Sequence, residues 1–476
     1  MHILHRSVAL EALYDSADSF PPPRCHPETR REILAKSYNW LTEDASAQPM
    51  SWLYGPAGAG KSAIMQTLCR QLQEAGRLGG AFFFKRDHVT RGNAKALFTT
   101  LAYQLAENDD RLKPTISQTV ERYSSIVGRE MEVQLHHLIV EPCRALPNSP
   151  PSIFLVDGLD ECQDDSVQSD ILRLIGNAVR KYPTRFRFLV ASRPEAAISE
   201  TVDDPLFTEL LTRLNIEQSF NDVRTYLRDE FARIHREHRH TMGGIPTPWP
   251  SPDVLNDLVQ KSSGYFVYAS TVIKFVDDKW FRPTERLNDV LNLRSGAPFK
   301  ALDQLYLYIL SSVPVDFRSR LLDIFQCVAM GLELTPGAIE DLFEWPPGDS
   351  QLILRGLRSL LHVPPPGNKR SVSAQHASLL DFLCDEGRSA AFYLDLQTRM
   401  HVTRAVLKAF SHEDGLPPTL WTLDVNVLYR CISSVPPSSE LVPLFRGLNT
   451  STLRGSILLD PLEHCSEQVE DMLFIL

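Results

Sequence analysis

The residues with the clearest chemical meaning lie between positions 55 and 62, where the sequence reads GPAGAGKS. This spacing matches GxxxxGK[ST], and it follows an apolar run and precedes a helical pattern, as a phosphate-binding loop requires. Small residues let backbone N–H groups close around a phosphate, and the positive end of the following helix points to the same place. We expect Lys61 to reach the β- and γ-phosphates of a nucleotide and Ser62 to bind Mg²⁺. The remaining phosphate-binding positions are Gly55, Pro56, Ala57, Gly58, Ala59 and Gly60.

A second chemical signal is the acidic cluster in SIFLVDGLDEC (152–162), where Asp157 follows four apolar residues. A carboxylate at the end of a buried strand is costly to desolvate without a partner, and Mg²⁺ is such a partner. Asp157 is therefore the predicted metal-side carboxylate. Glu161 is the candidate for polarising an attacking water, and Asp160 for sharing metal or water positioning. The alternative for both is acidic residues at a helix N-terminus, where they are favoured anyway.

The third signal is an arginine at the end of another apolar run, RFRFLVASRPEA. Ser192 and Arg193 close this strand, and Pro194 is expected to begin a helix. A strand-end arginine beside the phosphate loop can contact the γ-phosphate, so Arg193 is a candidate sensor. A salt bridge from Arg193 to a surface carboxylate is the alternative, and the spacing does not decide between the two.

These residues must be positioned by an alternation of strands and helices. Apolar runs predict strands at 51–55, 81–87, 152–158, 185–192 and 209–216. Helical spacing lies between them, as at 31–42, 62–75 and 93–107. Such alternation favours an α/β fold with a largely parallel sheet, and near-continuous apolar strands indicate helices on both faces.

After about residue 217 the strand signals fade and the patterns are helical. Predicted helices cover 219–235, 252–262, 264–276, 300–312, 316–330, 336–343, 352–362, 372–383 and 396–411, with a small strand element among those after 316. The expected organisation is an N-terminal helix and proline-rich linker (1–35), a nucleotide-binding domain (36–217), a helical domain (218–298), a winged-helix-like domain (299–395) and a C-terminal helical segment (396–476).

Composition limits the partners. Of the 476 residues 43% are hydrophobic and 23% charged, as in ordinary globular protein, and the formal net charge is −10. This balance argues against a general nucleic-acid binder, so no nucleic-acid partner is expected. The apolar run at 264–276 is too short to span a bilayer, and no membrane span is predicted. His136 and His137 are adjacent, so they are expected to face different directions on a helix.

In this order, the segments GPAGAGKS, FLVDGLDE and LVASRP resemble a NACHT domain, a member of the STAND class of signal-transducing P-loop ATPases. The segments CHPETR (25–30) and GYFVYASTVIKFV (264–276) resemble the fungal, nephrocystin-like NACHT group. The resemblance covers roughly residues 8–411. It implies a P-loop NTPase sheet followed by helical and winged-helix-like lobes, with ATP or ADP and Mg²⁺ as cofactors.

The resemblance extends to QHASLLDFL (375–383), which is similar to an H-x-S-x-x-[DE]-F segment of the winged-helix part of these proteins. The family implies that His376 touches the β-phosphate of bound ADP and locks a closed state. Where related switches carry Gly-Leu-Pro-Leu, with a proline beside the adenine, Gly264 is followed by Tyr-Phe-Val. The adenine contact is therefore open, and the segment from His26 to Arg30 is a candidate for part of it.

The resemblance implies a cytoplasmic switch that hydrolyses ATP slowly and self-associates when activated. Innate-immune-like and incompatibility responses are the signalling settings that it suggests. Two alternatives stay open, a nucleotide-holding scaffold and a related ATPase motor, and whether the chain acts as an enzyme is undecided. Effector and sensor modules are unknown. The chain is expected to be a switch core, either without such modules or as a piece of a longer protein.

Overall fold

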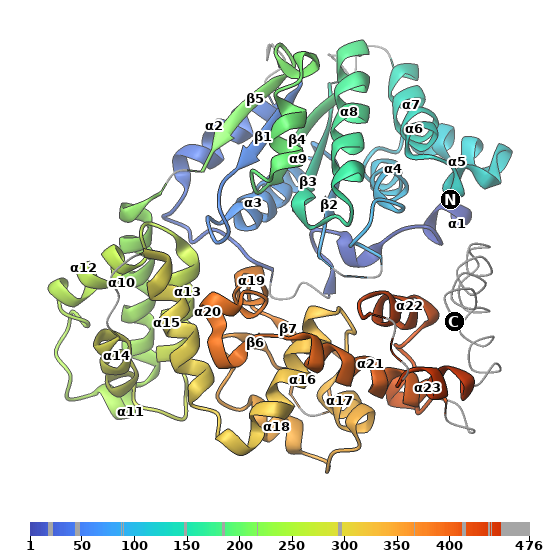
Figure 1. The fold of residues 1–476 in the computed structure, drawn as a ribbon. Coiled ribbons are helices and arrows are strands. Elements are labelled where there is room, and N and C mark those ends of the chain that lie inside the picture. The colour runs from blue at the N-terminus through green and yellow to red at the C-terminus, as the bar shows by residue number, and fades with distance from the viewer. Residues whose placement is uncertain are drawn as a thin grey trace. The chain divides into compact units, whose positions relative to one another are not determined.

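Figure 1 shows the computed structural model of the chain. The structure describes residues 1–17, 22–42, 48–86, 88, 90–146, 150–182, 186–216, 218–293, 298–365, 367–411, 416–436, 438 and 440–448. It divides into two compact units, an α/β unit (Met1–Glu230 with Pro252–Val267) and a helical unit (Phe231–Ser251 with Tyr268–Leu476). The finer five-part division drawn from the sequence stays a prediction.

A parallel sheet of five strands forms the centre of the α/β unit. The strands are β1 (Met50–Tyr54), β2 (Leu78–Phe83), β3 (Ser152–Asp157), β4 (Phe186–Ser192) and β5 (Leu211–Asn215). Their order is β2-β3-β4-β1-β5, and every described pairing is parallel. The predicted parallel α/β sheet is confirmed.

Strand β2 begins three residues earlier than the sequence predicts, because it contains a glycine pair that does not look like a strand interior. A Cβ on Gly80 would lie 3.1 Å from the carbonyl oxygen of Leu101 in α4 (Leu97–Asn108). The missing side chain therefore lets helix α4 pack directly on this strand.

Helices cover both faces of the sheet, as predicted (Figure 1). Alternate residues of β3 point to opposite faces. Phe154 belongs to a core with residues of α4 and α8 (Asp165–Lys181), and Leu155 to a core with residues of α2 (Arg31–Thr42) and α3 (Lys61–Glu74). Buried apolar contacts on both sides explain why these strands are continuous hydrophobic runs.

Shorter elements complete the α/β unit. They are α1 (His2–His5), η1 (Leu10–Ala12), α5 (Lys113–Arg122), η3 (Ser124–Gly128), α6 (Met131–Gln134), the π-helix η4 (Leu135–Val140), α7 (Glu141–Ala145), η5 (Leu159–Glu161), α9 (Ala196–Val202), η6 (Pro205–Phe207) and α12 (Pro252–Lys261). Helix α10 (Phe220–Glu237) begins here and continues into the helical unit. The helix expected to begin at Pro194 instead begins at Ala196, after an extended N-cap residue, Glu195.

The helical unit contains one small sheet among its helices. Strands β6 (Leu361–His362) and β7 (Ser373–Ala374) pair antiparallel. With α16 (Arg318–Ala329), α17 (Pro336–Phe343), α18 (Asp349–Leu354) and α19 (Ala377–Leu383), they lie within residues 299–395, where the winged-helix-like domain stays a prediction. The helices predicted at 352–362 and 372–383 are too long: α18 already ends at Leu354 and α19 begins only at Ala377, and a two-residue strand lies in the non-helical part of each range.

The other elements of this unit are α11 (Arg239–Met242), α13 (Phe266–Val276, which begins in the α/β unit), α14 (Pro283–Asn292), α15 (Pro298–Ser311), η7 (Val315–Phe317), α20 (Glu386–Ser389), η8 (Ala390–Phe392), α21 (Leu396–Phe410), η9 (Pro418–Leu420), α22 (Val425–Ser433) and α23 (Val442–Arg446). The last part of the predicted C-terminal helical segment, 449–476, lies outside the described residues.

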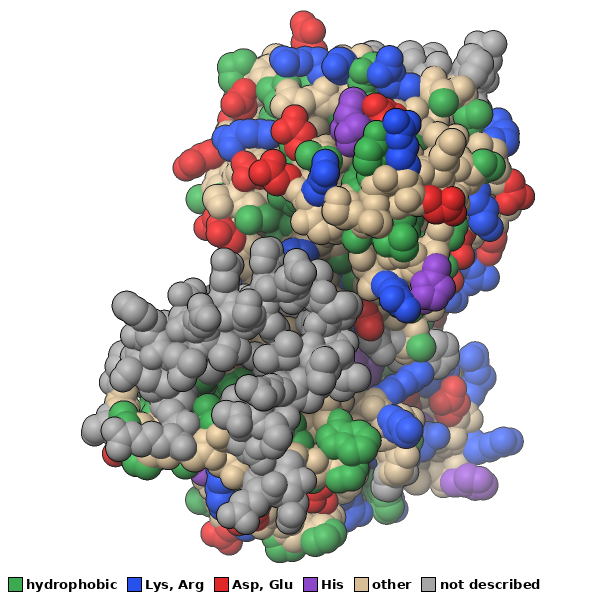
Figure 2. Space-filling view, turned by 90° about the vertical axis from the view of Figure 1, so that its right-hand side faces the viewer, with side chains coloured by type: hydrophobic (Ala, Val, Ile, Leu, Met, Phe, Trp, Pro, Cys, Tyr) green, Lys and Arg blue, Asp and Glu red, His purple; other side chains and the backbone are tan. Residues whose placement is uncertain are grey.

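Two surface properties bear on partners. Within the described ranges, no helix combines the length and the apolar character needed to cross a bilayer. On the face drawn in Figure 2, acidic and basic side chains are interspersed over the described surface.

Candidate functional site

Three neighbouring strands bring the predicted site residues of the α/β unit to one edge of the sheet. Strand β4 lies between β1 and β3, with Tyr54 in register with Ser192 and Asp157 in register with Ala191. Because the strands are parallel, the loop after β1, the end of β3 and Arg193 after β4 share the carboxyl edge. Ligands of open α/β sheets bind at this edge.

The loop after β1 owes its shape to two glycines with left-handed backbone. Gly58 has φ +75° and Gly60 has φ +94°. A Cβ on Gly58 would lie 2.3 Å from Cγ1 of Val267, so a larger residue would clash there. Gly60 is the N-cap of α3, whose first residue is Lys61. The loop thus leads directly into the positive end of a 14-residue helix.

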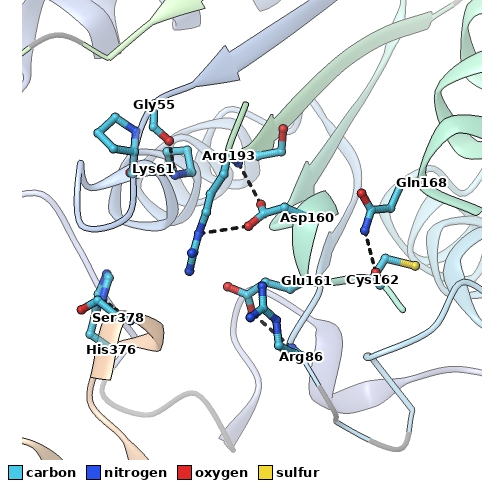
Figure 3. Close-up of polar contacts among 12 residues, drawn as sticks. Gly55, Lys61, Arg86, Asp160, Glu161, Cys162, Gln168, Arg193, His376 and Ser378 are labelled. Atoms are coloured by element: carbon cyan, nitrogen blue, oxygen red, sulfur yellow. Dashed lines mark hydrogen bonds and ion pairs between the residues drawn. The ribbon is translucent and has the colours of Figure 1, made fainter. Parts of the chain in front are cut away.

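The Lys61 ammonium group lies within its own loop. Its Nζ donates hydrogen bonds to the carbonyl oxygens of Gly55 (2.7 Å) and Pro56 (3.0 Å), as Figure 3 shows for Gly55. Burial lowers the pKa of Lys61, while the nearby carboxylates of Asp160 and Asp157 oppose that shift. Neutral carbonyl oxygens therefore hold the Lys61 ammonium group beside the loop. A negatively charged oxygen is a stronger acceptor for an ammonium group and could replace them.

Asp157 and Ser62 meet at this edge. Asp157 is 4% exposed, and burial raises the pKa of its carboxyl to about 7, against a lowering contribution from a hydrogen bond with the Ser62 side chain. Its Oδ1 atom is buried and has no hydrogen-bond partner among the described residues. A buried carboxylate oxygen without a partner, next to a hydroxyl oxygen, fits the oxygen ligands that Mg²⁺ prefers.

Asp160 and Arg193 form a buried ion pair (Figure 3). The backbone N–H of Arg193 donates to Oδ1 of Asp160 at 2.9 Å, and its Nε lies 3.2 Å from Oδ2. The Asp160 side chain is 3% exposed and that of Arg193 15%. At least one partner of Arg193 is therefore a buried carboxylate at the same edge of the sheet, and its role as a γ-phosphate sensor stays a prediction.

Glu161 lies one residue further on, in the short 3₁₀ turn η5 that follows β3. Its Oε2 accepts a hydrogen bond from the backbone N–H of Arg86 at 3.2 Å. Burial raises the pKa of Glu161, and the charge of Asp160 adds to the rise. Helix α8 begins only at Asp165. Asp160 and Glu161 therefore lie before α8, in the first turn of the 3₁₀ helix η5, and their roles stay predictions.

The sequence did not reveal that Arg30 contacts the phosphate-binding loop. Its Nη2 donates to the carbonyl oxygen of Ala59 at 2.9 Å, and its backbone N–H donates to Oδ2 of Asp222 in α10 at 3.2 Å. The guanidinium carbon lies 5.4 Å from the ring centre of Phe266. Arg30 thus links the proline-rich segment, the loop and two helices. In the sequence, the only sign that Arg30 has a role was its position in CHPETR, and that position suggested a contact with adenine.

His376 belongs to the helical unit, where it is the N-cap of α19. Its Nδ1 accepts the backbone N–H of Ser378 at 3.0 Å, and Oγ of Ser378 lies 2.7 Å from the same atom. The Tyr306 hydroxyl contacts that Oγ at 2.9 Å. Because Nδ1 accepts an amide proton, a neutral His376 carries its own proton on Nε2, which makes Nε2 a hydrogen-bond donor.

Residues 28–193 match the protein family described as Nephrocystin 3, N-terminal. This segment contains the loop, Asp157, Asp160, Glu161 and Arg193, and it confirms the nephrocystin-like resemblance seen in the sequence. No curated protein matches the chain.

Several solved structures share the fold at low identity. The Aeropyrum pernix Orc1 protein in complex with DNA is 14% identical, with 75% of this chain and 91% of that chain covered and a TM-score of 0.34. Cdc6p from Pyrobaculum aerophilum is 14% identical, with 80% and 97% covered and a TM-score of 0.35. Drosophila ORC bound to DNA is 13% identical, with 72% and 84% covered and a TM-score of 0.36. The P-loop NTPase fold of the chain follows from its own five-stranded parallel sheet and from the GxxxxGK[ST] loop between β1 and α3.

The expectation that the chain has no nucleic-acid partner is corrected by these structures. Two of the three are complexes with DNA. Net charge was the basis of that expectation, and net charge over a whole chain does not decide what a particular face binds. Their likeness to this chain concerns the fold, and DNA is what those proteins bind.

Proposed function

We propose that this chain, nephrocystin-like over residues 28–193, is a NACHT-type member of the STAND switches that binds ATP or ADP with Mg²⁺ and hydrolyses ATP slowly. The observation that carries the proposal is the pairing of Ser62 with Asp157 beside the loop. A hydroxyl and a buried carboxylate oxygen without a described partner lie where the loop's amides and the helix end favour an anion.

Lys61 supplies the first response to a nucleotide. In the structure its three ammonium protons have two carbonyl acceptors, at Gly55 and Pro56. Phosphate oxygens carry full charge and form stronger hydrogen bonds with an ammonium group than carbonyls do. The Lys61 ammonium group would therefore donate its hydrogen bonds to the β- and γ-phosphates, and the carbonyl groups of Gly55 and Pro56 would lose this donor.

Ser62 and Asp157 would hold the metal, and Mg²⁺ bound there would neutralise charge on the phosphates. Asp157 must give up any proton to become a metal ligand. With a pKa of about 7, that proton leaves easily near neutral pH.

Glu161 is proposed as the residue that polarises the attacking water, and Arg193 as the γ-phosphate sensor. A carboxylate whose pKa is raised by burial is a better proton acceptor than an exposed one. The structure supports a different role for Asp160 from the metal or water positioning first considered. Its two oxygens bind the backbone and side chain of Arg193, so Asp160 is a positioning residue for that guanidinium.

His376 is proposed to read the nucleotide from the helical unit. Its locked tautomer would present an Nε2–H donor to a phosphate oxygen of ADP, as the family resemblance implies. A ligand that contacts two conformations of the chain differently shifts the population between them. ATP in place of ADP would then release an oligomerisation surface for signalling. A cytoplasmic location stays a prediction.

Calorimetric titration of the full chain with ADP and Mg²⁺ tests the proposal. Lys61→Ala should weaken ADP binding by at least about 100-fold, because hydrogen bonds between charged groups contribute about 1.5–3 kcal/mol each. Lys95→Ala, at an exposed lysine, is the matched control and should bind like the wild type. Equal ADP affinity in the wild type and Lys61→Ala would refute the assignment of the loop.

A further inference from the structure

The helix between α5 and β3 is interrupted by one π-helical segment, η4 (Leu135–Val140). The backbone N–H of Glu141 donates to the carbonyl oxygen of His136, five residues earlier. Pro142 follows at the start of α7. Proline has no N–H, and in a regular α-helix its ring would clash with the carbonyl four residues earlier. The wider turn therefore has an identifiable cause in the sequence.

The π-helix has a buried side and an exposed side. Its buried residues are Leu135, Leu138, Ile139 and Val140, and all four belong to the core between the sheet and α4 and α8. The side chains of His136, His137 and Glu141 are 43%, 38% and 46% exposed. The apolar side thus anchors the helix, and these three polar side chains lie together on its outer side.

The wider turn brings both histidines to one carboxylate. His136 Nε2 lies 3.5 Å from Glu141 Oε1, and His137 Nδ1 lies 2.8 Å from Glu141 Oε2. The two imidazole ring centres are 5.0 Å apart. The expectation that adjacent histidines face different directions is therefore wrong here. It assumed α-helical spacing, whereas a π turn places residue 141 next to residue 136 as well as next to 137.

We propose that His136, His137 and Glu141 form a binding site for a divalent transition metal of the zinc type. One ligand atom from each residue lies within 4.8 Å of the others. Zinc–nitrogen and zinc–oxygen bonds of about 2.0–2.1 Å in tetrahedral geometry place ligand atoms about 3.3 Å apart. The two nitrogen–oxygen distances are already close to that value, so only rotation of exposed side chains is needed.

The ligand set selects the class of metal. Two imidazoles and one carboxylate suit Zn²⁺, Cu²⁺ and Ni²⁺, whereas Mg²⁺ and Ca²⁺ prefer oxygen ligands alone. Three protein ligands leave a fourth position for water or for a group from another molecule. The site is distinct from Ser62 and Asp157, so it goes beyond the proposed nucleotide function and does not depend on it.

Binding of Zn²⁺ and Co²⁺ to the full chain, without nucleotide and after treatment with a chelator, tests the site. The wild type should take up one metal ion per chain with a tetrahedral Co²⁺ absorption spectrum that Zn²⁺ abolishes. His136→Gln, His137→Gln and Glu141→Gln should each weaken Zn²⁺ binding by at least about tenfold, since even changes to residues behind the ligands cost 10–100-fold. His240→Gln, at an exposed histidine of another helix, is the matched control and should bind like the wild type.

Two results would overturn the site. The first is a Co²⁺ spectrum that the wild type leaves identical to that of free aqueous Co²⁺, because it would mean that the three side chains only pair with one another. The second is an unchanged Zn²⁺ affinity in Glu141→Gln and both histidine variants. Thermal unfolding with chelator present checks that each variant is folded. The Co²⁺ spectrum uses the wild type alone, so it decides the matter even where a variant does not fold.

Discussion

Replacing Asp157 by Asn should change how the stability of the ligand-free protein depends on pH. In the folded protein the pKa of Asp157 is raised from 3.8 to about 7, chiefly by burial. Glu161 and Asp160 add to the rise, and Ser62 and Lys61 oppose it. The folded state therefore binds this proton more tightly than the unfolded state does. Stability from this group is fully present below the unfolded pKa and is lost as the pH rises through about 7.

The magnitude follows from the shift. Between the two pKa values the free energy of unfolding falls by about 1.36 kcal/mol per pH unit for each extra proton bound by the folded state. Most of the change between pH 5 and pH 8 occurs over about two pH units, which gives roughly 3 kcal/mol. Asn at position 157 keeps an acceptor for Ser62 and has no proton to lose, so this contribution disappears.

The assay is urea unfolding of the wild type and Asp157→Asn at pH 5, 6, 7 and 8, with a chelator and without nucleotide. The difference in unfolding free energy between the two proteins should move by roughly 3 kcal/mol in favour of the variant from pH 5 to pH 8. Asp170→Asn, at an exposed aspartate in α8, should show no such drift. A constant difference between the wild type and Asp157→Asn across this range would refute the raised pKa of this buried carboxyl.

Three further predictions concern the roles of individual side chains. Glu161→Gln should bind ATP normally and release phosphate at least about 100-fold more slowly, and normal phosphate release would remove Glu161 from that role. Asp160→Asn should leave ADP binding nearly unchanged but reduce the preference for ATP, since Arg193 loses an anionic partner that positions it. Equal affinities for ATP and ADP in both the wild type and the variant would contradict the role of Arg193 as a γ-phosphate sensor. His376→Ala should release ADP faster and enlarge the protein in X-ray scattering. Nucleotide retention and scattering equal to those of the wild type would show that the histidine locks nothing.

The sequence predicted the sheet because its signals are local and strong. Strands β3 and β4 are short, mostly apolar runs, and burial on both faces removes any regular polar alternation. Two-residue strands such as β6 and β7 carry no such period, so they were assigned to the ends of helices. The π turn at residues 135–140 depends on Pro142 within an otherwise helical pattern, and spacing rules for α-helices misplaced the two histidines.

Within the site, residue types predicted which side chains gather but not how they pair. A motif places Lys61 and Ser62 because the loop geometry is set by neighbouring glycines. The Asp160–Arg193 pair connects the segments that follow strands β3 and β4. The hydrogen bond from Arg30 to Ala59 connects residues that are 29 positions apart in the sequence. Such pairings depend on strand order and on the path of the chain, which no local pattern contains.

The nucleotide carried by the purified protein tests the central claim most directly. Acid denaturation of the full chain, followed by chromatography of the released small molecules, gives both its identity and its amount. A phosphate-binding loop completed by Ser62 and Asp157 predicts about one adenine nucleotide per chain, mostly ADP, and much less from Lys61→Ala. A wild-type protein that carries no nucleotide, and that takes up none from millimolar ADP with Mg²⁺, would contradict the account.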